Sequence, residues 1–323
     1  MSRFDTFSSP IVIALLVVIG SLVGTPAAFA QYQGHNFKGD FGVNSGSQPG
    51  PGIYVGLPYG QWNADAIKDA DGNPFLPTQF GGFDLRIVPL TAIVVTPRKF
   101  LGANYGFMAA FTFSTIKPER VNEDVADQTD WGFSDTYVVP LMLGWHTPRA
   151  DYVAGYGFYA PTGRYEAGAS DNVGLGMWSH EIQAGVTAYL DEAKRISLAT
   201  TAYLEIHSKK KDQDLKVGNL LTLEGGAAYN VPKLGGAFGI AYALQNKISD
   251  DSGRDIPEAI LRALNLRGRN RIFGIGPDVT MGVFQRGTTA GLVNVRYLWD
   301  SAAKTSFEGG TFWMSFTLAK LRP

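Results

Sequence analysis

The chain has 323 residues, a net charge of −1, no cysteine and only 18% charged residues. The balanced charge gives no electrostatic attraction to nucleic acid, which is therefore excluded as an expected partner. Without cysteine, the chain uses neither disulfides nor thiolate ligands.

Residues 1–30 have the order of features of a secretory signal peptide. Arg3 supplies a positive charge, residues 11–23 are almost entirely apolar, and Ala28-Phe29-Ala30 fits a signal-peptidase cleavage site. The alternative is a membrane anchor, but the apolar stretch is too short for a spanning helix. We expect an exported mature chain that starts at Gln31.

Residues 31–52 are rich in glycine, serine, asparagine, glutamine and proline. Two interpretations stay open for this segment: a flexible leader, or a plug that enters the interior of the fold that follows. Residues 53–323 are expected to form one transmembrane domain, for the reasons given next.

Strict alternation of side chains predicts strands with two different surroundings. In residues 197–207 the apolar side chains occupy even positions, and polar side chains occupy many of the odd ones. Residues 181–191 and 311–318 alternate in the same way. A period of two over such lengths is typical of strands with one face in lipid and one in water.

The predicted strands are joined by connections that alternate between long and short. We expect strands near residues 50–58, 84–97, 104–116, 134–146, 151–162, 177–190, 195–208, 217–230, 236–247, 270–285, 290–300 and 307–319. Long connections fall at 59–83, 117–133, 163–176, 209–216 and 248–269, and short ones at 98–103, 147–150, 191–194, 231–235 and 286–289. The connection at 301–306 is short where a long one is due.

This pattern predicts an all-β fold, a closed antiparallel transmembrane β-barrel of about 12 strands with short periplasmic turns and longer external loops. Closure is required because an open sheet edge in lipid would leave backbone N–H and C=O groups without partners. We expect the barrel in the bacterial outer membrane, with both termini periplasmic. Expected partners are outer-membrane lipid and, during biogenesis, the barrel-assembly machinery.

Residues 255–266, in a predicted external loop, have the pattern of a short helix. Asp255 can cap it, Pro257 suits the first turn and Glu258 follows three positions after the cap. The helix either covers the mouth of the barrel as a lid or packs on the rim. Its apolar stripe consists of Ile256, Ile260, Leu261 and Leu264.

The middle third of the chain carries a set of motifs. They are the run from Ser134 to Pro140, Leu143-Gly144-Trp145-His146, the run from Gly155 to Gly163, the run from Asn172 to Trp178, the run from Tyr203 to His207, and Leu223-Glu224-Gly225-Gly226. This region resembles the family described as the MetA-pathway of phenol degradation, whose members are also called SphA-type outer-membrane transporters. The resemblance implies an outer-membrane barrel associated with the catabolism of aromatic or other hydrophobic compounds. One departure is the C-terminus, which ends in Pro323 rather than in an aromatic residue.

The polar faces of the predicted strands supply candidates for the lining of the lumen. Three glutamates among them indicate a mildly acidic interior that could orient a permeating solute through hydrogen bonds. In the alternative interpretation these groups neutralise one another, with Arg296 pairing a glutamate and His207 bonding another, and they fill a narrow barrel. The candidates are His146, Glu181, Gln183, Tyr203, Glu205, His207, Glu224, Gln245, Asn294 and Arg296.

Enzyme motifs are weak in this sequence. Glu205 and His207 share a strand face, but two ligands are fewer than the three or four that zinc takes. Ser179 and His180 are neighbours on a predicted strand, so their side chains point to opposite faces and do not form a dyad. We expect no enzymatic activity, no metal and no cofactor.

Three functions remain open on this evidence. The first is a channel for small hydrophobic or aromatic solutes, to which the family resemblance adds a link to the phenol meta-pathway. The second is a structural or ligand-binding barrel without transport, and the third is an outer-membrane hydrolase with a catalytic triad at a strand end. Axial and lateral permeation are both compatible with the sequence.

Overall fold

The computed structural model describes residues 32–74, 82–118, 130–169, 171–256, 258–263, 265–285 and 288–321. The predicted signal peptide and Gln31 lie outside the described residues. The strands are β1 (Gly52–Lys68), β2 (Phe83–Phe100), β3 (Ala103–Pro118), β4 (Gly132–Phe133), β5 (Thr136–His146), β6 (Ala150–Ala160), β7 (Ser179–Tyr189), β8 (Ile196–His207), β9 (Leu220–Val231), β10 (Gly236–Lys247), β11 (Arg271–Gln285), β12 (Thr288–Lys304) and β13 (Ser306–Leu321).

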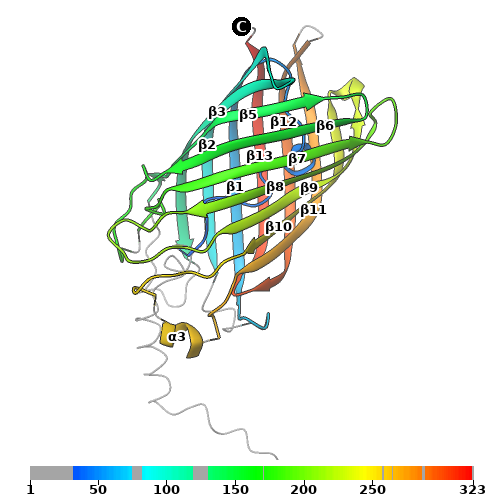
Figure 1. Cartoon of the computed structure of the whole chain (residues 1–323). Coiled ribbons are helices and arrows are strands. Elements are labelled where there is room, and N and C mark those ends of the chain that lie inside the picture. The colour runs from blue at the N-terminus through cyan, green and yellow to red at the C-terminus, as the bar shows by residue number, and fades with distance from the viewer. Residues whose placement is uncertain are drawn as a thin grey trace, which may run out of the picture.

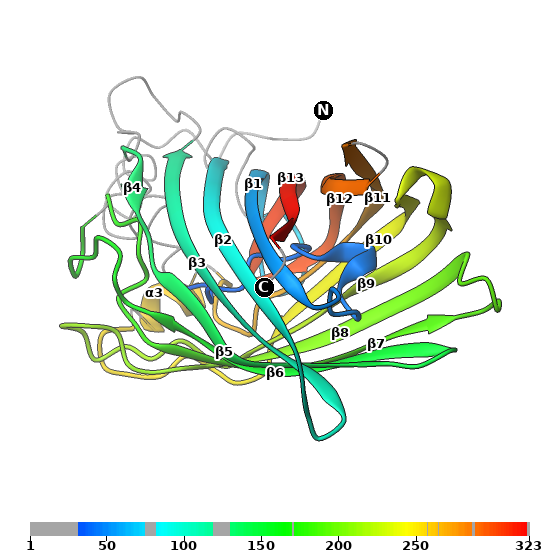
Figure 2. The same ribbon diagram turned by 90° about the horizontal axis from the view of Figure 1, so that it is seen from above.

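Twelve long strands close into an antiparallel barrel (Figures 1 and 2). Each strand pairs with its neighbours in the sequence, and β1 pairs with both β2 and β13, which closes the ring. The short strand β4 pairs only with the end of β3. The predicted fold class is therefore confirmed, since closure gives every long strand two hydrogen-bonded neighbours.

The two faces of the wall carry different side chains, as the alternation in the sequence predicts. Along β8 the odd-numbered residues from Ser197 to His207 are buried, whereas Leu198 is 45% exposed on the other face. On β13, Trp313 is buried and Met314, Phe316 and Leu318 are exposed. The exposed apolar side chains face outward, where lipid would solvate them.

The connections divide the barrel into two ends, here called the turn end and the loop end. At the turn end, β2 and β3 are joined by Leu101 and Gly102, both with positive φ, as a two-residue hairpin with the right-handed twist of its strands requires. At the loop end, all connections are long except that between β12 and β13, which is Thr305 alone. Strand β1 extends to Lys68, ten residues beyond the predicted strand, which shortens the first loop.

Helix α3 (Glu258–Ala263) lies at the loop end, within the segment predicted to be helical (Figure 1). Ile256 and Leu261 belong to an apolar cluster with Trp62, Phe83 and Phe307 from the ends of the strands. The helix therefore packs on the rim. The side chains of Ile260 and Leu264 lie outside the described part of the chain. No helix among the described residues is long and apolar enough to span a membrane.

The two ends of the described chain lie at opposite ends of the barrel. The backbone carbonyl of Tyr32 accepts a hydrogen bond from Lys247, at the loop end of β10. Leu321 pairs with Ile53 at the turn end. Both termini are predicted to be periplasmic, whereas the described chain begins and ends at opposite ends of the barrel because residues 32–50 run through it.

We predict that a charged side chain on the outer face of the barrel destabilises the fold where that face meets the hydrocarbon of the bilayer, but not in the turns. Ile240, near the middle of β10, is 58% exposed on the outer face. Ile240→Arg is expected to lower the free energy of unfolding by ~2–4 kcal/mol, because a cation would be placed near the bilayer midplane. Urea titration in phospholipid vesicles measures this. Leu234→Arg, at an exposed position in the turn after β9, is the matched control, and an equal loss in both variants would contradict the assignment of the outer face.

Candidate functional site

Residues 32–50, named here the luminal segment, run inside the ring of strands from the loop end to the turn end (Figure 2). The segment contains only one short element, the 3-10 turn η1 (Gly42–Asn44). Most of its polar contacts join it to the inner faces of β7 to β13. The candidate site consists of this segment, the polar wall that it contacts and the space that it leaves open.

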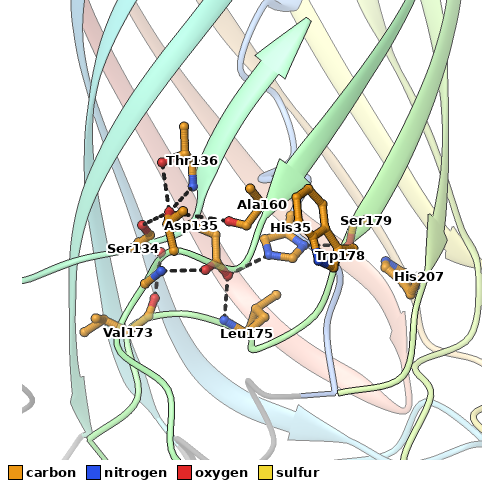
Figure 3. A network of polar contacts seen from close by, with 12 residues as sticks. His35, Ser134, Asp135, Thr136, Ala160, Val173, Leu175, Trp178, Ser179 and His207 are labelled. Carbon is orange, nitrogen blue, oxygen red and sulfur yellow. Dashed lines mark hydrogen bonds and ion pairs between the residues drawn. The ribbon is translucent and has the colours of Figure 1, made fainter. Parts of the chain in front are cut away.

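Near the loop end, His35 joins the luminal segment to two parts of the wall (Figure 3). Its Nε2 lies 2.8 Å from the Asp135 carboxylate, and its Nδ1 lies 2.7 Å from the Ser179 hydroxyl. The imidazole stacks on Tyr159 with 4.6 Å between the ring centroids. Asp135 also accepts backbone N–H bonds from Gly163 and Leu175, so the connection between β6 and β7 at the loop end helps to hold it in place.

Burial alone would lower the pKa of His35, but its hydrogen bonds to the carboxylates of Asp135 and Glu205 outweigh burial and raise it. Burial alone would likewise raise the pKa of Asp135, but the hydrogen bond from His35, its charge and the two backbone donors lower it. Both shifts favour a charged pair.

Two wall glutamates bind backbone and amide groups of the luminal segment. Glu205 accepts the backbone N–H groups of His35 and Asn36 at 2.7 and 3.1 Å. The side-chain amide of Asn36 donates to Glu181 at 3.0 Å, and Tyr137 also donates to Glu181. Glu181 and Glu205 are directly opposite each other on β7 and β8. These carboxylates therefore have donors supplied by the segment rather than facing open water.

Lys38 is the cation that the luminal segment presents to the wall. Its ammonium lies 3.1 Å from the Asp300 carboxylate, and both side chains are at most 3% exposed. The same ammonium donates to the Thr311 hydroxyl at 2.7 Å and lies 4.0 Å from the Trp62 ring centroid. A buried charge needs partners of this kind, because taking it out of water alone costs several kcal/mol.

The middle of the segment is bound by Arg296 and Asp278. Arg296 donates to the backbone carbonyls of Gly39 and Asp40, and its Nε lies 2.7 Å from Asp278. Asp278 in turn accepts the backbone N–H of Val43 at 3.0 Å. Arg296 therefore pairs with an aspartate, and not with a glutamate as the alternative interpretation of the sequence expected.

Glycine residues create the room in which the segment lies. A Cβ on Gly226 of β9 would come within 2.8 Å of Val43, and one on Gly144 of β5 would come within 2.5 Å of Gln48. Within the segment, Gly42 has a φ of +49°, and a Cβ there would lie 2.2 Å from the Arg296 side chain. Gly144 therefore tolerates no larger side chain unless the segment moves. At Gly226 the backbone carbonyl of Ile240 on the neighbouring strand β10 also excludes a Cβ.

All ten predicted lumen candidates belong to strands and point to the inside of the wall, and six of them line the cavity described below: Glu181, Tyr203, Glu224, Gln245, Asn294 and Arg296. Gln183 is half-buried, His146 is exposed at the turn end beside Asp151 at 3.1 Å, and the other eight are at most 9% exposed. Five of them bond directly to the luminal segment: Glu181, Glu205, Glu224, Gln245 and Arg296. His207 bonds Glu205 at 2.9 Å, Asn294 bonds Asp278 at 2.6 Å, and Tyr203 lines the cavity described below.

Five charged or titratable residues of the site were not among the predicted candidates: His35 and Lys38 of the luminal segment, and their wall partners Asp135, Asp278 and Asp300. His35 and Lys38 precede the first strand, so strand periodicity assigns them no face. Asp135 lies within the strand predicted at residues 134–146, but β5 begins only at Thr136. Asp278 and Asp300 lie on strands at positions that the alternation could have included. Their charge, at positions on the same face as the predicted lumen residues, could have identified Asp278 and Asp300 as lumen candidates.

Ser179, His35 and Asp135 form a Ser–His–Asp row, but its geometry does not suit hydrolysis. Ser179 bonds Nδ1 and Asp135 bonds Nε2, the reverse of the arrangement in serine hydrolases. The Ser179 side chain is also fully buried, so no substrate carbonyl reaches it. His180 points to the outer face, 2.8 Å from the Tyr156 hydroxyl. Within the described part of the chain, no three His, Asp or Glu residues are grouped as metal ligands.

A cavity of about 350 Å³ lies between the luminal segment and the inner faces of β1 to β3. Its wall on the strand side is mainly apolar, and the residues there include Leu85, Ile87, Pro89, Ile93, Met108 and Ile116. Its opposite side carries His35, Asn36 and Lys38 of the segment. The cavity also reaches polar residues of the wall on the other side of the lumen, which include Asp135, Glu181, Tyr203, Glu224, Gln245, Asn294 and Arg296. The lumen is thus divided into a polar side, where the segment is bound, and an apolar side along β1 to β3, which stays open.

Comparison with known proteins agrees with the barrel. The family model described as "Putative MetA-pathway of phenol degradation" matches residues 64–316. The COG4313 outer membrane channel from Pseudomonas putida F1 is similar in structure, with a TM-score of 0.70 and 13% sequence identity over 88% of this chain and 100% of that chain. This likeness supports the fold.

Weaker likenesses include the KdgM porin, with a TM-score of 0.40 and 8% identity over 83% of this chain and 99% of that chain. The transport unit of the autotransporter AIDA-I from Escherichia coli has a TM-score of 0.45 and 10% identity over 85% of this chain and 91% of that chain. No curated protein is significantly similar in sequence.

The Lys38–Asp300 pair is expected to stabilise the bound segment. Lys38→Met leaves the Asp300 carboxylate buried without its cation, which should cost about 3–5 kcal/mol in unfolding free energy. Lys38→Met combined with Asp300→Leu should recover most of that loss, because no unpaired charge remains. Urea titration of the four members of this cycle measures the coupling. Lys304→Met, at an exposed position, is the control, and additive losses in the cycle would contradict the pairing.

The His35–Asp135 contact predicts that binding of the segment depends on pH. A histidine with a raised pKa contributes stability that is fully present below its ordinary pKa of about 6.5 and lost as pH rises through its folded value. Asp135, with its lowered pKa, contributes above its ordinary value and loses its contribution only in acid. Raising the pH from 6 to 9 should therefore speed protease cleavage within residues 32–50. His35→Gln should remove this dependence, and an unchanged pH profile in that variant would contradict it.

Proposed function

The chain belongs to the family described as putative MetA-pathway of phenol degradation, and from this premise we propose that it is an outer-membrane channel for small hydrophobic or aromatic compounds. The fold is that of outer-membrane barrels. The observation that carries the substrate class is the open, apolar half of the lumen.

The cavity suits a solute that is apolar on one side and carries a polar group on the other. Ile87 and Met108 offer aliphatic surface from the wall, while Asn36 and Lys38 lie on the segment across from them. Its volume of about 350 Å³ exceeds the ~150 Å³ of an engineered apolar cavity that binds benzene. A single aromatic ring with a hydroxyl group therefore fits by size and by polarity.

In this proposal the luminal segment acts as a plug that sets the width of the channel. Its contacts run from Tyr32 at the loop end to Ser47, whose hydroxyl donates to Asp151 at 2.6 Å near the turn end. The bound segment fills the half of the lumen that would otherwise pass polar solutes. We propose that the turn end faces the periplasm, which places Leu321 there and Tyr32 at the external mouth.

The two other candidate functions have less support. A ligand-binding barrel without transport would use the same cavity, so only flux distinguishes it from a channel. A hydrolase would need an accessible nucleophile, and Ser179 is buried. Outer-membrane lipid and the assembly machinery remain the partners that any such barrel requires.

We predict that filling the cavity blocks the flux of aromatic solutes. Ala110 of β3 lines the cavity and is 6% exposed, and Ala109 next to it points outward. Ala110→Trp should reduce uptake of radiolabelled toluene several-fold in porin-deficient Gram-negative cells, whereas Ala109→Trp should leave uptake near that of the unmodified chain. Equal uptake in both variants, or no uptake above the empty vector with the unmodified chain, would reject the proposed channel.

Deletion of residues 34–48 should widen the channel and relax its selectivity. Without the segment, the carboxylates of Glu181, Glu205 and Glu224 would face water in an open lumen. Uptake of radiolabelled arabinose is therefore expected to rise several-fold in cells that express the deletion variant, while the unmodified chain admits little. If arabinose uptake stays low in correctly folded barrels, the segment does not set the width.

A further inference from the structure

One charged side chain faces the open space of the cavity. Among the described residues, the Asp, Glu, His, Lys and Arg side chains that line the cavity are buried or half-buried with one exception: His35, Lys38, Asp135, Glu181, Glu224 and Arg296. The exception is Asp40 of the luminal segment, which is exposed. Because the segment runs inside the ring of strands (Figure 2), this exposure is to the lumen. A solute in the cavity therefore meets the charge of Asp40 directly.

The basic side chains of the cavity already have carboxylate partners. They are Lys38, Arg296 and His35, which lie 3.1, 2.7 and 2.8 Å from the carboxylates of Asp300, Asp278 and Asp135. Arg296 also attracts Asp40, but within the described part of the chain the Asp40 carboxylate has neither a hydrogen bond nor an ion pair. No base that lines the cavity is left to pair with Asp40 among the residues described.

Contacts of the backbone hold Asp40 in this position. Arg296 donates to the backbone carbonyl of Asp40 at 2.9 Å, and the backbone N–H of Phe41 donates to Glu224 at 3.3 Å. The carboxylates of Glu181 and Glu224 on that side of the lumen repel the Asp40 carboxylate. The backbone is thus bound to the polar wall, and repulsion directs the side chain toward the open side.

The wall across from the segment offers no charge of its own. The described residues of β1, β2 and β3 that line the cavity are apolar or carry a hydroxyl group, as Met108 and Thr112 do. Charges interact more strongly beside such low-dielectric surfaces than they do in water. A fixed charge in a cleft of this kind raises the local concentration of oppositely charged solutes and lowers that of like-charged ones. Asp40 is therefore placed to decide which charge a solute can carry.

We propose that Asp40 determines the charge selectivity of the channel, which admits neutral and cationic solutes and excludes aromatic carboxylates. This inference rests on the proposed function and narrows the substrate class of the same cavity. An anionic ring is repelled by Asp40, and the bases that could attract it are buried with their own partners. A neutral ring with a hydroxyl group meets no such repulsion.

A thiol placed in the cavity reports the charge there, because the chain contains no native cysteine. Burial within the barrel raises the pKa of Asp40 to about 6, so the measurement is made near pH 7.5, where the carboxylate is ionised. A cationic and an anionic methanethiosulfonate of similar size are reacted with Thr112→Cys, on the β3 side of the cavity. The ratio of the cationic to the anionic rate, divided by that ratio for a free thiol, should exceed about ten. Asp40→Asn should lower this ratio several-fold.

Two further variants separate charge from structure. Glu192→Gln is the matched control, since it removes a carboxylate that is 89% exposed in the turn after β7, and it should leave the ratio unchanged. Asp40→Asn combined with Asn44→Asp moves the charge to another exposed position that lines the cavity and should restore the ratio. The proposal is overturned by equal ratios with and without Asp40, by a loss that the relocated carboxylate does not reverse, or by a cavity thiol that neither reagent labels.

Uptake measurements connect charge selectivity to the proposed function. Benzoate and toluene differ in charge but little in size, so their radiolabelled forms are compared in porin-deficient Gram-negative cells. The ratio of benzoate to toluene uptake should be low for the unmodified chain and should rise several-fold in Asp40→Asn. If the unmodified chain carries toluene and this ratio is the same in both proteins, the role of Asp40 is wrong while the channel stands. If toluene uptake is absent, the proposed function fails, and the thiol reaction still decides the role of Asp40.

Discussion

Backbone hydrogen bonding in hydrocarbon is the constraint on which this structure depends. A strand placed in lipid has to pair on both edges, because no water is present to bind its N–H and C=O groups. Twelve long strands meet that requirement by closing, with β1 pairing to both β2 and β13. Closure then creates an interior, and the remaining features of the molecule concern how that interior is filled.

The interior is filled by the chain itself, and the electrostatics of the wall explain how. Buried carboxylates are costly unless donors surround them. Glu205 and Asp278 obtain donors from backbone N–H groups of the luminal segment, and Asp300 obtains a cation from Lys38. The wall in turn stabilises the segment, because backbone N–H groups of the segment that have no strand partner donate to the wall carboxylates. The polar half of the barrel and residues 32–50 therefore stabilise each other, and the apolar inner faces of β2 and β3 line the cavity that remains.

The sequence predicted the wall well because a strand's periodicity is local. The alternation in residues 197–207 correctly assigned each inward and outward side chain of β8. The same reasoning could not predict the site, because the contacts that build it join distant positions, such as His35 and Glu205. The inner face of the middle of β2 could not be identified from the sequence either, since Ile87 and Ile93 are as apolar as the outward-facing residues 88, 90, 92 and 94. Where both faces are apolar, periodicity carries no information about which side is the lumen.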